Sequence, residues 1–174
     1  MPRAAVFLDR DGVINVCAPP HDYIKRWSEF QFLPQVDTAI AKLNKKRIYV
    51  FVVTNQRGVA RGLMTVENVD DIHRHMRHSL MEKQAVIDDI FVCPHESGTC
   101  HCRKPDIGLF LQAEQQYDID KTHSFMIGDS VGDIQAGKKY GITTISIGST
   151  CFDGDYHFHD LNEAVDYILG GNIG

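Results

Sequence analysis

Short apolar segments rich in β-branched residues alternate with amphipathic segments along almost the whole of this 174-residue chain. Residues 48–53 form an uninterrupted apolar run, which is typical of a strand buried on both faces of a sheet. Residues 35–46 instead carry apolar side chains three and four positions apart, as on one face of a helix. Because strands that alternate with helices pair in parallel, the pattern predicts an α/β fold.

The same patterns predict the individual elements. We expect strands at residues 4–8, 48–53, 90–92, 124–127 and 143–147, and helices at residues 35–46, 65–84, 107–117, 131–140 and 160–169. Thr65 is the expected N-cap of the second helix, and Asp160 and Glu163 resemble a capping box at the last one. These elements predict a doubly wound, Rossmann-like parallel sheet with strand order 3-2-1-4-5. We expect one domain over residues 1–174, without a separate cap domain and with frayed residues 170–174.

Composition and charge argue against several classes of protein. Hydrophobic residues make up 43% and charged residues 24% of the chain, as is ordinary for a globular protein. The net charge of −5 argues against a protein held mainly by nucleic-acid phosphates. No apolar stretch approaches the roughly 20 residues that a membrane-spanning helix needs. Residues 1–5 lead directly into the first predicted strand, so we expect no signal peptide and a cytoplasmic location.

Two aspartates follow the first predicted strand in the sequence Val-Phe-Leu-Asp-Arg-Asp-Gly-Val, residues 6–13. Side chains two apart at the end of a strand point the same way, so Asp9 and Asp11 are expected to face one crevice. Neighbouring carboxylates are costly unless a cation or a reaction requires them. A nucleophilic carboxylate beside an acid/base carboxylate suits phosphoryl transfer through an acyl phosphate.

Two further predicted strands are followed by groups that suit a phosphate. Thr54, Asn55 and Gln56 follow the second strand, and their hydroxyl and amide groups can bind a phosphoryl oxygen. After the third strand, Arg103 and Lys104 supply cations that can offset a phosphate dianion beside an aspartate. A simple turn and a solvated pair of cations are the alternative interpretations of these two motifs.

Asp129 lies at the end of the fourth predicted strand, and Asp133 follows on the first turn of the next helix. In a sheet of order 3-2-1-4-5, the first and fourth strands are neighbours and the topology reverses between them. Asp9, Asp11 and Asp129 are expected to meet at this switch point, where three acidic groups call for Mg²⁺. Asp133 could orient water or a loop amide, or could only add negative charge at the helix N-terminus.

Four residues that bind soft metals gather after the third predicted strand: Cys93, His95, Cys100 and Cys102. Three thiolates and one imidazole suit tetrahedral Zn²⁺, and four protein ligands leave no open position for a substrate. We therefore predict a structural zinc loop, with a metal-free Cys-rich loop as the alternative. The two remaining cysteines, Cys17 and Cys151, are expected to be free thiols.

The order and positions of these motifs resemble the haloacid-dehalogenase-like phosphohydrolases over nearly the whole chain. The motifs that carry the resemblance are Asp9-x-Asp11-Gly12, Thr54-Asn55, Lys104 and Gly128-Asp129-x-x-x-Asp133. The resemblance implies that Asp9 is the nucleophile and Asp11 the general acid/base. It also implies that Thr54 and Lys104 bind the phosphoryl group. Mg²⁺ would be held by Asp9, by Asp129 and by the main-chain carbonyl of Asp11.

The zinc loop ends in Cys-Arg-Lys-Pro and resembles the subfamily that contains heptose-bisphosphate and histidinol-phosphate phosphatases. Residues 9–15 and 54–62 are similar to the heptose branch, which implies removal of the 7-phosphate from D-glycero-D-manno-heptose 1,7-bisphosphate. The expected substrate-binding residues are Asn55, Gln56, Arg57, Arg61 and Arg103, the arginines being the candidate cations for the second phosphate. The expected partner is this small phosphorylated sugar, without nucleic acid or membrane, and a monomer is expected, with a dimer as the alternative.

Three other functions stay open at this stage. A histidinol-phosphate phosphatase would need acidic groups at the mouth of the site, which Asp22 or Glu96 could supply. A nucleic-acid 3′-phosphatase would share the chemistry, but the sequence has no basic stripe. A noncatalytic zinc-stabilised binding domain would have no need of the second aspartate, Asp11.

Several remaining motifs have an ordinary structural interpretation. His73, His75 and His78 stand at i, i+2 and i+5 of the second predicted helix, so they share no face and are expected to be solvated. The segment around His157 is expected to be a surface loop. Three aromatic residues are expected to anchor the first loop on the core, with a nucleobase platform as the alternative: Trp27, Phe30 and Phe32.

Overall fold

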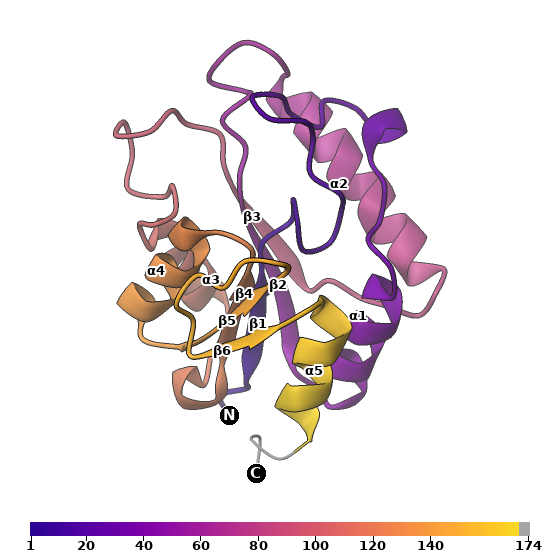
Figure 1. The fold of residues 1–174 in the computed structure, drawn as a ribbon, viewed down its shortest axis with the longest axis vertical. Coiled ribbons are helices and arrows are strands. Elements are labelled where there is room, and N and C mark those ends of the chain that lie inside the picture. Colours follow the sequence, from indigo (N-terminus) through magenta and orange to yellow (C-terminus); the bar gives the residue numbers. More distant parts are fainter. Residues whose placement is uncertain (171–174) are drawn as a thin grey trace.

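A computed structural model describes residues 1–170 of the chain. Over that range the strands form one six-stranded sheet in the order β3-β2-β1-β4-β5-β6, with every neighbouring pair parallel (Figure 1). The strands are β1 (Ala5–Leu8), β2 (Tyr49–Asn55), β3 (Asp89–Cys93), β4 (Phe125–Gly128), β5 (Thr143–Ile147) and β6 (Tyr156–Phe158). The predicted order 3-2-1-4-5 is confirmed, with β6 added outside β5.

Helices cover both faces of this sheet (Figure 1). One face packs against α1 (Val36–Lys45), α2 (Val66–Met81) and α5 (Leu161–Leu169), and the other against α3 (Gly108–Gln116) and α4 (Val131–Tyr140). Alternate side chains of β1 divide between the two faces: Val6 and Leu8 join the first core, Ala5 and Phe7 the second. All four are fully buried, which explains why the strand reads as a continuous apolar run.

Capping groups set several of the predicted boundaries. Thr65 Oγ1 accepts a hydrogen bond from Asn68 N at 3.1 Å, and Asn68 Oδ1 accepts one from Thr65 N at 2.9 Å, which closes a capping box at α2. The helix ends at Met81 instead of near Gln84, because Gln84 has a φ of 61°, which no α-helix contains.

The capping box predicted at α5 is only half formed. Asp160 Oδ1 accepts a hydrogen bond from Glu163 N at 2.9 Å, as expected for an N-cap. The Glu163 carboxylate instead accepts from His159 N at 3.0 Å, one residue before the N-cap. The end of the chain predicted to fray lies outside the described residues, apart from Gly170, the C-cap of α5.

The prediction of a loop around His157 is wrong, because Tyr156–Phe158 forms β6. This strand is three residues long and lies at the edge of the sheet, so it lacks the apolar run that marks the other strands. Polar contacts attach it to β5: His157 Nδ1 lies 2.6 Å from Ser146 Oγ, and the nearby Asp155 carboxylate accepts from Thr144 N at 2.8 Å. Such contacts leave no periodic hydrophobic signal.

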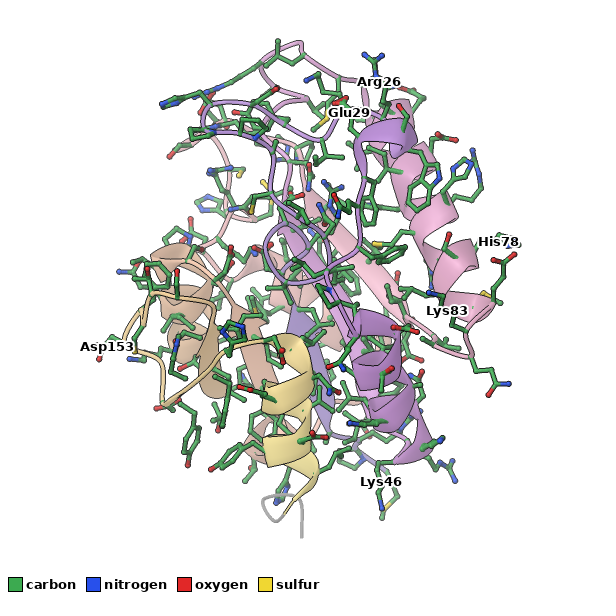
Figure 2. The ribbon with its side chains drawn as sticks, turned by 45° about the vertical axis from the view of Figure 1, so that its right-hand side comes forward. Arg26, Glu29, Lys46, His78, Lys83 and Asp153 are labelled. Carbon is green, nitrogen blue, oxygen red and sulfur yellow. The ribbon has the colours of Figure 1, made fainter. Side chains whose placement is uncertain are left out.

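Three loops gather at the carboxyl ends of β1, β2 and β3, at the upper end of the molecule in Figure 1: residues 12–32, 56–64 and 94–106. Arg26 and Glu29 lie at this end in Figure 2, whereas Lys46 lies at the opposite end. Trp27 stacks on Phe30 at 4.9 Å between ring centroids, and the aromatic residues of the first loop pack against the core as predicted. Among the described residues, no helix has both the length and the apolar character needed to cross a bilayer.

Candidate active site

The first and fourth strands lie side by side, and each leads directly into an aspartate. Asp9 N donates a hydrogen bond to Ile127 O at 3.1 Å, which continues the pairing of β1 with β4. Asp129 follows the last residue of β4. Gly12 allows the next loop to approach Asp129, because its φ is 88° and a Cβ there would lie 1.8 Å from Asp129 Oδ2. Asp9 and Asp129 therefore meet at the switch point as predicted, but the carboxylate that joins them is that of Asp133 and not that of Asp11.

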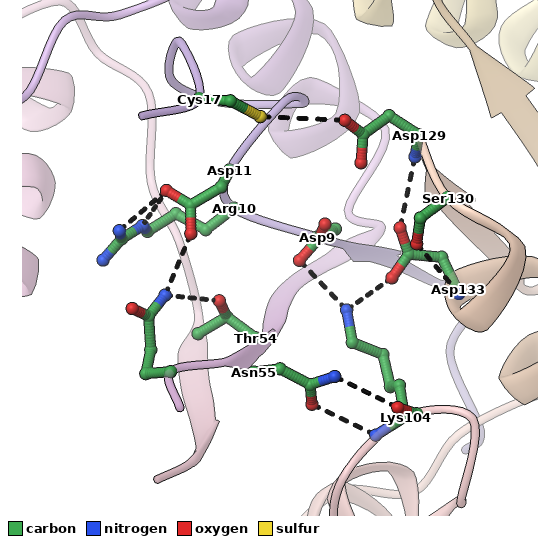
Figure 3. Close-up of polar contacts among 11 residues, drawn as sticks. Asp9, Arg10, Asp11, Cys17, Thr54, Asn55, Lys104, Asp129, Ser130 and Asp133 are labelled. Carbon is green, nitrogen blue, oxygen red and sulfur yellow. Dashed lines mark hydrogen bonds and ion pairs between the residues drawn. The ribbon is translucent and has the colours of Figure 1, made fainter. Parts of the chain in front are cut away.

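Lys104 joins two of the carboxylates at this point (Figure 3). Its Nζ donates hydrogen bonds to Asp9 Oδ1 at 3.0 Å and to Asp133 Oδ1 at 2.6 Å. The other oxygen of Asp133 accepts from Asp129 N at 3.2 Å. Asp133 thereby connects the lysine to the loop after β4, and its contact with Asp129 N agrees with the expectation that it could orient a loop amide.

The backbone of Lys104 is fixed by Asn55, at the end of β2. Asn55 Nδ2 donates to Lys104 O at 3.1 Å, and Lys104 N donates to Asn55 Oδ1 at 3.1 Å. Both polar atoms of the Asn55 side chain are thus engaged with the main chain of the lysine (Figure 3). Its predicted contact with substrate stays a prediction, and the observed contact positions Lys104.

The Asp11 carboxylate is turned toward a different set of partners from Asp9. Asp11 Oδ1 accepts from Arg10 Nη2 at 2.8 Å and from Asn15 Nδ2 at 2.8 Å, while Oδ2 accepts from Gln56 Nε2 at 3.1 Å. Gln56 Nε2 also donates to Thr54 Oγ1 at 2.8 Å. Gln56 and Thr54 are both buried, so this amide connects Asp11 to β2.

Two of the acidic groups near Lys104, Asp9 and Asp129, resist ionisation. Burial, and then the charge of Asp133, raise the pKa of Asp9 well above its ordinary value. Burial and Asp133 also raise the pKa of Asp129 to about 6. For Lys104, burial lowers the pKa, but the charges of Asp133 and Asp9 outweigh it and raise the pKa above its usual range. One lysine thus faces three carboxyl groups, and the site is short of positive charge.

A divalent cation fits this charge deficit. Asp9, Asp129 and Asp133 each offer a carboxylate oxygen, and these atoms lie within 4.8 Å of one another. Oxygen ligands of this kind suit a hard cation such as Mg²⁺. The Asp11 carboxylate is outside this group.

The four predicted zinc ligands also come together. Cys93 Sγ lies 3.6 Å from Cys100 Sγ and 3.5 Å from His95 Nδ1, and His95 Nδ1 lies 3.2 Å from Cys102 Sγ. With Zn–S bonds of about 2.3 Å and Zn–N bonds of about 2.0 Å, a tetrahedral site places two sulfur atoms about 3.8 Å apart and sulfur and nitrogen about 3.5 Å apart, close to these separations. Gly108 lets the loop pack on α3, since a Cβ there would lie 2.5 Å from the carbonyl oxygen of His101.

Two of the arginines predicted to bind the second phosphate, Arg57 and Arg61, share the carboxylate of Glu96, and we call this pair the rim arginines. Arg57 Nη1 lies 3.3 Å from Glu96 Oε1, and Arg61 Nε lies 2.9 Å from Glu96 Oε2. Arg61 Nη1 also donates to Tyr23 Oη at 3.2 Å. The third predicted arginine, Arg103, has a buried Nη1 without a hydrogen-bond partner among the described residues. Such an unmet donor costs about 1–3 kcal/mol unless an acceptor reaches it.

The prediction that the three α2 histidines are all solvated is wrong for His73. His73 is 6% exposed, and its Nε2 lies 3.1 Å from Arg10 Nη1. His78 lies on the outer surface of the helix, as expected (Figure 2). Among the described residues, the two cysteines outside the zinc loop, Cys17 and Cys151, are free.

The fold and these motifs match a known family of phosphatases. A family model described as "Polynucleotide kinase 3 phosphatase" matches residues 5–165. The chain belongs to this family. A solved "putative had-like phosphatase" from Mesorhizobium loti is 30% identical with a TM-score of 0.82, covering 96% of this chain and 88% of its own. The resemblance to haloacid-dehalogenase-like phosphohydrolases is thus confirmed, and the chain is a phosphatase.

Curated relatives in this family carry one recurring name. A D-glycero-beta-D-manno-heptose-1,7-bisphosphate 7-phosphatase of Rhodopseudomonas palustris is 41% identical over 80% of this chain and 81% of its own. The Campylobacter jejuni enzyme named for the alpha anomer is 33% identical over 99% of this chain and 100% of its own. The crystal structure of the heptose 1,7-bisphosphate phosphatase from B. bronchiseptica, complexed with magnesium and phosphate, is 31% identical with a TM-score of 0.86. It covers 96% of this chain and 98% of its own.

We predict that Asp129→Asn stabilises the magnesium-free protein at neutral pH. The pKa of Asp129 is raised from 3.8 to about 6, so the folded state binds this proton more tightly than the unfolded state does. The ionised Asp129 carboxylate therefore destabilises the folded protein. This effect is absent below the pKa of Asp129 in the unfolded state and complete above its pKa in the folded state. The variant should therefore gain about 1–3 kcal/mol in urea unfolding at about pH 7 and little at about pH 4.

The matched control is Asp118→Asn, whose exposed carboxylate lies 3.8 Å from the N-terminal amine of Met1. Adding Mg²⁺ should stabilise the parent protein and this control, but not Asp129→Asn. Equal stabilisation of all three proteins by Mg²⁺ would remove Asp129 from the metal site.

Proposed function

We propose that the chain hydrolyses the 7-phosphate of a D-glycero-D-manno-heptose 1,7-bisphosphate through an aspartyl phosphate on Asp9. The observation that carries the proposal is the division of labour between the two aspartates. Asp9 lies against the Lys104 ammonium in the acidic group that suits Mg²⁺, whereas Asp11 is held apart by Arg10, Asn15 and Gln56. A nucleophile and a separate proton carrier are what two-step phosphoryl transfer requires.

In the first step, an Asp9 oxygen attacks phosphorus in line with the sugar oxygen that leaves. The bond from phosphorus to the sugar oxygen breaks, and Asp11 gives that oxygen its proton. Asp11 is ionised in the free protein: burial raises its pKa, but the Arg10 charge and three hydrogen bonds outweigh burial and lower it. A phosphate monoester, whose second pKa is about 6, arrives partly protonated and can supply the proton to Asp11.

In the second step, the Asp11 carboxylate takes a proton from water, and the water oxygen attacks the aspartyl phosphate. The bond between phosphorus and the Asp9 oxygen breaks, which releases phosphate and restores Asp9. The departing phosphate takes the proton from Asp11, which returns to its ionised form. Lys104 stays beside the transferred group throughout and offsets its negative charge, and the Thr54 hydroxyl is the second proposed phosphoryl ligand. Asp9, Asp129 and the main-chain carbonyl of Asp11 would hold Mg²⁺, with Asp133 adjacent, and the ion would supply electrostatic stabilisation of the phosphoryl oxygens.

We propose Zn²⁺ as a structural ion on Cys93, His95, Cys100 and Cys102. The four donors saturate a tetrahedral ion, so no position remains for a substrate. The loop leads directly into Arg103 and Lys104, so the metal would hold the backbone from which both cations project.

The rim arginines support a substrate with a second phosphate. Arg57 and Arg61 converge on Glu96, which keeps both guanidinium groups at one place. A phosphate carries more negative charge than a carboxylate and can accept the same hydrogen bonds, so it can replace Glu96 there. The curated relatives act, by their names, on a 1,7-bisphosphate, which has such a second phosphate.

The histidinol-phosphate alternative is weaker because of the same contacts. Its substrate carries an ammonium group, yet Glu96 is occupied by two arginines and Asp22 Oδ1 by Lys25 Nζ at 2.8 Å. The nucleic-acid 3′-phosphatase alternative is supported by the family name but not by the net charge of −5. We further propose that residues 1–174 form one domain, since both cores pack on the same sheet.

We predict that Asp9→Asn abolishes turnover while the fold and the zinc content persist. Asparagine is nearly isosteric with aspartate but cannot form the acyl phosphate. Asp11→Asn should lower kcat by roughly 10²–10⁴-fold, the usual contribution of general acid–base catalysis. Phosphate release is the measurement, with the exposed Asp153→Asn as control. Substantial steady-state activity of Asp9→Asn would exclude the covalent mechanism.

We predict about one Zn²⁺ per chain, and a loss of both stability and activity in Cys100→Ser. Removing one thiolate opens the loop that precedes Lys104, so the lysine should lose its position beside Asp9. Metal analysis, thermal unfolding and kcat are measured together, with Cys151→Ser at an exposed free thiol as the matched control. Full activity in a zinc-free protein would contradict the proposed role of this loop.

We predict that Arg61→Ala reduces kcat/KM about tenfold on the heptose bisphosphate and less than twofold on p-nitrophenyl phosphate, because a lost charge-assisted contact costs about 1.4 kcal/mol or more. Only the bisphosphate offers a second anion to the rim. Arg26→Ala, at the same end of the molecule but outside the Glu96 cluster, is the control (Figure 2). A preference for histidinol phosphate, or equal losses on both phosphates, would overturn the substrate assignment.

A further inference from the structure

Arg10 stands between the two aspartates in sequence, but its side chain does not enter the open site. The residue is 0% exposed and is the largest of the fully buried side chains. A buried guanidinium is costly unless its N–H groups find acceptors. The partners of Arg10 therefore indicate what the fold uses it for.

Arg10 connects Asp11 to His73, which lies 63 positions after Arg10 in the chain. Nη2 and Nε donate to Asp11 Oδ1 at 2.8 Å and 3.3 Å, and Nη1 lies 3.1 Å from His73 Nε2 on α2. The Phe30 ring lies 5.8 Å from the guanidinium carbon. Arginine only donates hydrogen bonds, so His73 Nε2 must accept and the imidazole is the neutral form with its proton on Nδ1. Burial, and then the Arg10 charge, lower the pKa of His73 to about 3, which agrees with a neutral ring.

These contacts distinguish the two oxygens of the Asp11 carboxylate. Oδ1 accepts three N–H groups, two from Arg10 and one from Asn15. Oδ2 accepts one, from Gln56 Nε2. A carboxylate oxygen has two lone pairs, so Oδ1 is saturated and Oδ2 keeps a lone pair that can hold a proton.

The present inference rests on the function proposed above. We propose that Arg10, anchored by His73, is a positioning residue that makes Asp11 Oδ2 the oxygen that exchanges the catalytic proton. Oδ2 gives its proton to the leaving sugar oxygen and regains one from water in the second step. His73 acts indirectly. It holds Arg10 Nη1 in place, so that Arg10 Nη2 and Nε point at Asp11 Oδ1.

The test separates positioning from ordinary structural support by the chemistry of the leaving group. An alkoxide needs a proton to leave, whereas p-nitrophenolate leaves without one. The value of kcat/KM reports the steps up to release of the alcohol, so it isolates the protonation step from the later hydrolysis. His73→Leu removes the acceptor for Nη1, and His73→Gln can supply an amide oxygen in its place.

We expect His73→Leu to lower kcat/KM about tenfold on the heptose bisphosphate and less than twofold on p-nitrophenyl phosphate. The tenfold loss is only part of the roughly 10²–10⁴-fold contribution of general acid–base catalysis, because Asp11 itself remains in the variant. His73→Gln should recover to within about threefold of the parent. His78→Leu, on the outer face of the same helix, should match the parent on both substrates (Figure 2). Equal losses on the two substrates, without rescue by His73→Gln, would overturn the proposal.

Arg10→Lys provides a second variant if His73→Leu does not fold. A lysine keeps the charge but cannot place two parallel N–H groups on Oδ1, so the same difference between substrates is expected. Failure of the function proposed above gives a different result: the parent would cleave p-nitrophenyl phosphate but not the heptose bisphosphate. The comparison of variants is then made with the alkyl phosphate that the parent does hydrolyse, and equal losses again overturn the role of Arg10.

Discussion

The buried ion pair between Lys104 and the carboxylates of Asp9 and Asp133 organises the rest of the site. Lys104 is 4% exposed, and a lone ammonium at that depth would be expensive. Its backbone is fixed by Asn55 from β2, and its loop follows the four clustered Cys and His side chains that could hold a metal ion. Asn55 of β2, Asp133 of α4 and the loop of the Cys/His cluster therefore converge to place one cation beside the proposed nucleophile.

The same cluster explains why the site needs a second cation. Three carboxyl groups surround one lysine, and burial with mutual repulsion raises the pKa of Asp9 and of Asp129. Asp11 differs because the Arg10 charge and three hydrogen bonds lower its pKa despite burial. The surroundings thus raise the pKa of Asp9 and lower the pKa of Asp11, two residues further on. This difference suits Asp9 for the role of a metal-assisted nucleophile and Asp11 for proton transfer.

The predictions from sequence were correct for features that depend on a local apolar pattern or on the chemistry of a few neighbouring residues. The bounds Val131–Tyr140 and Thr143–Ile147 follow from apolar periodicity, and the metal-ligand cluster follows from the chemistry of its residues. The predictions missed β6, which polar contacts hold to β5. They also did not reveal the protein partners of Gln56 and Asn55, whose predicted contacts with substrate stay predictions. His73 carried a usable signal, since it stands four residues after Val69 and three before Met76, both buried on the same face.

The most direct test of the account is the identity of the phosphorylated residue. Borohydride reduces an acyl phosphate to an alcohol, so an aspartyl phosphate trapped during turnover becomes homoserine. The account predicts that peptide mass spectrometry finds homoserine at Asp9 after reaction with substrate and Mg²⁺, and at no other carboxylate of the site. Homoserine at Asp11 or Asp129, or its absence under turnover conditions, would contradict the covalent mechanism built on Asp9.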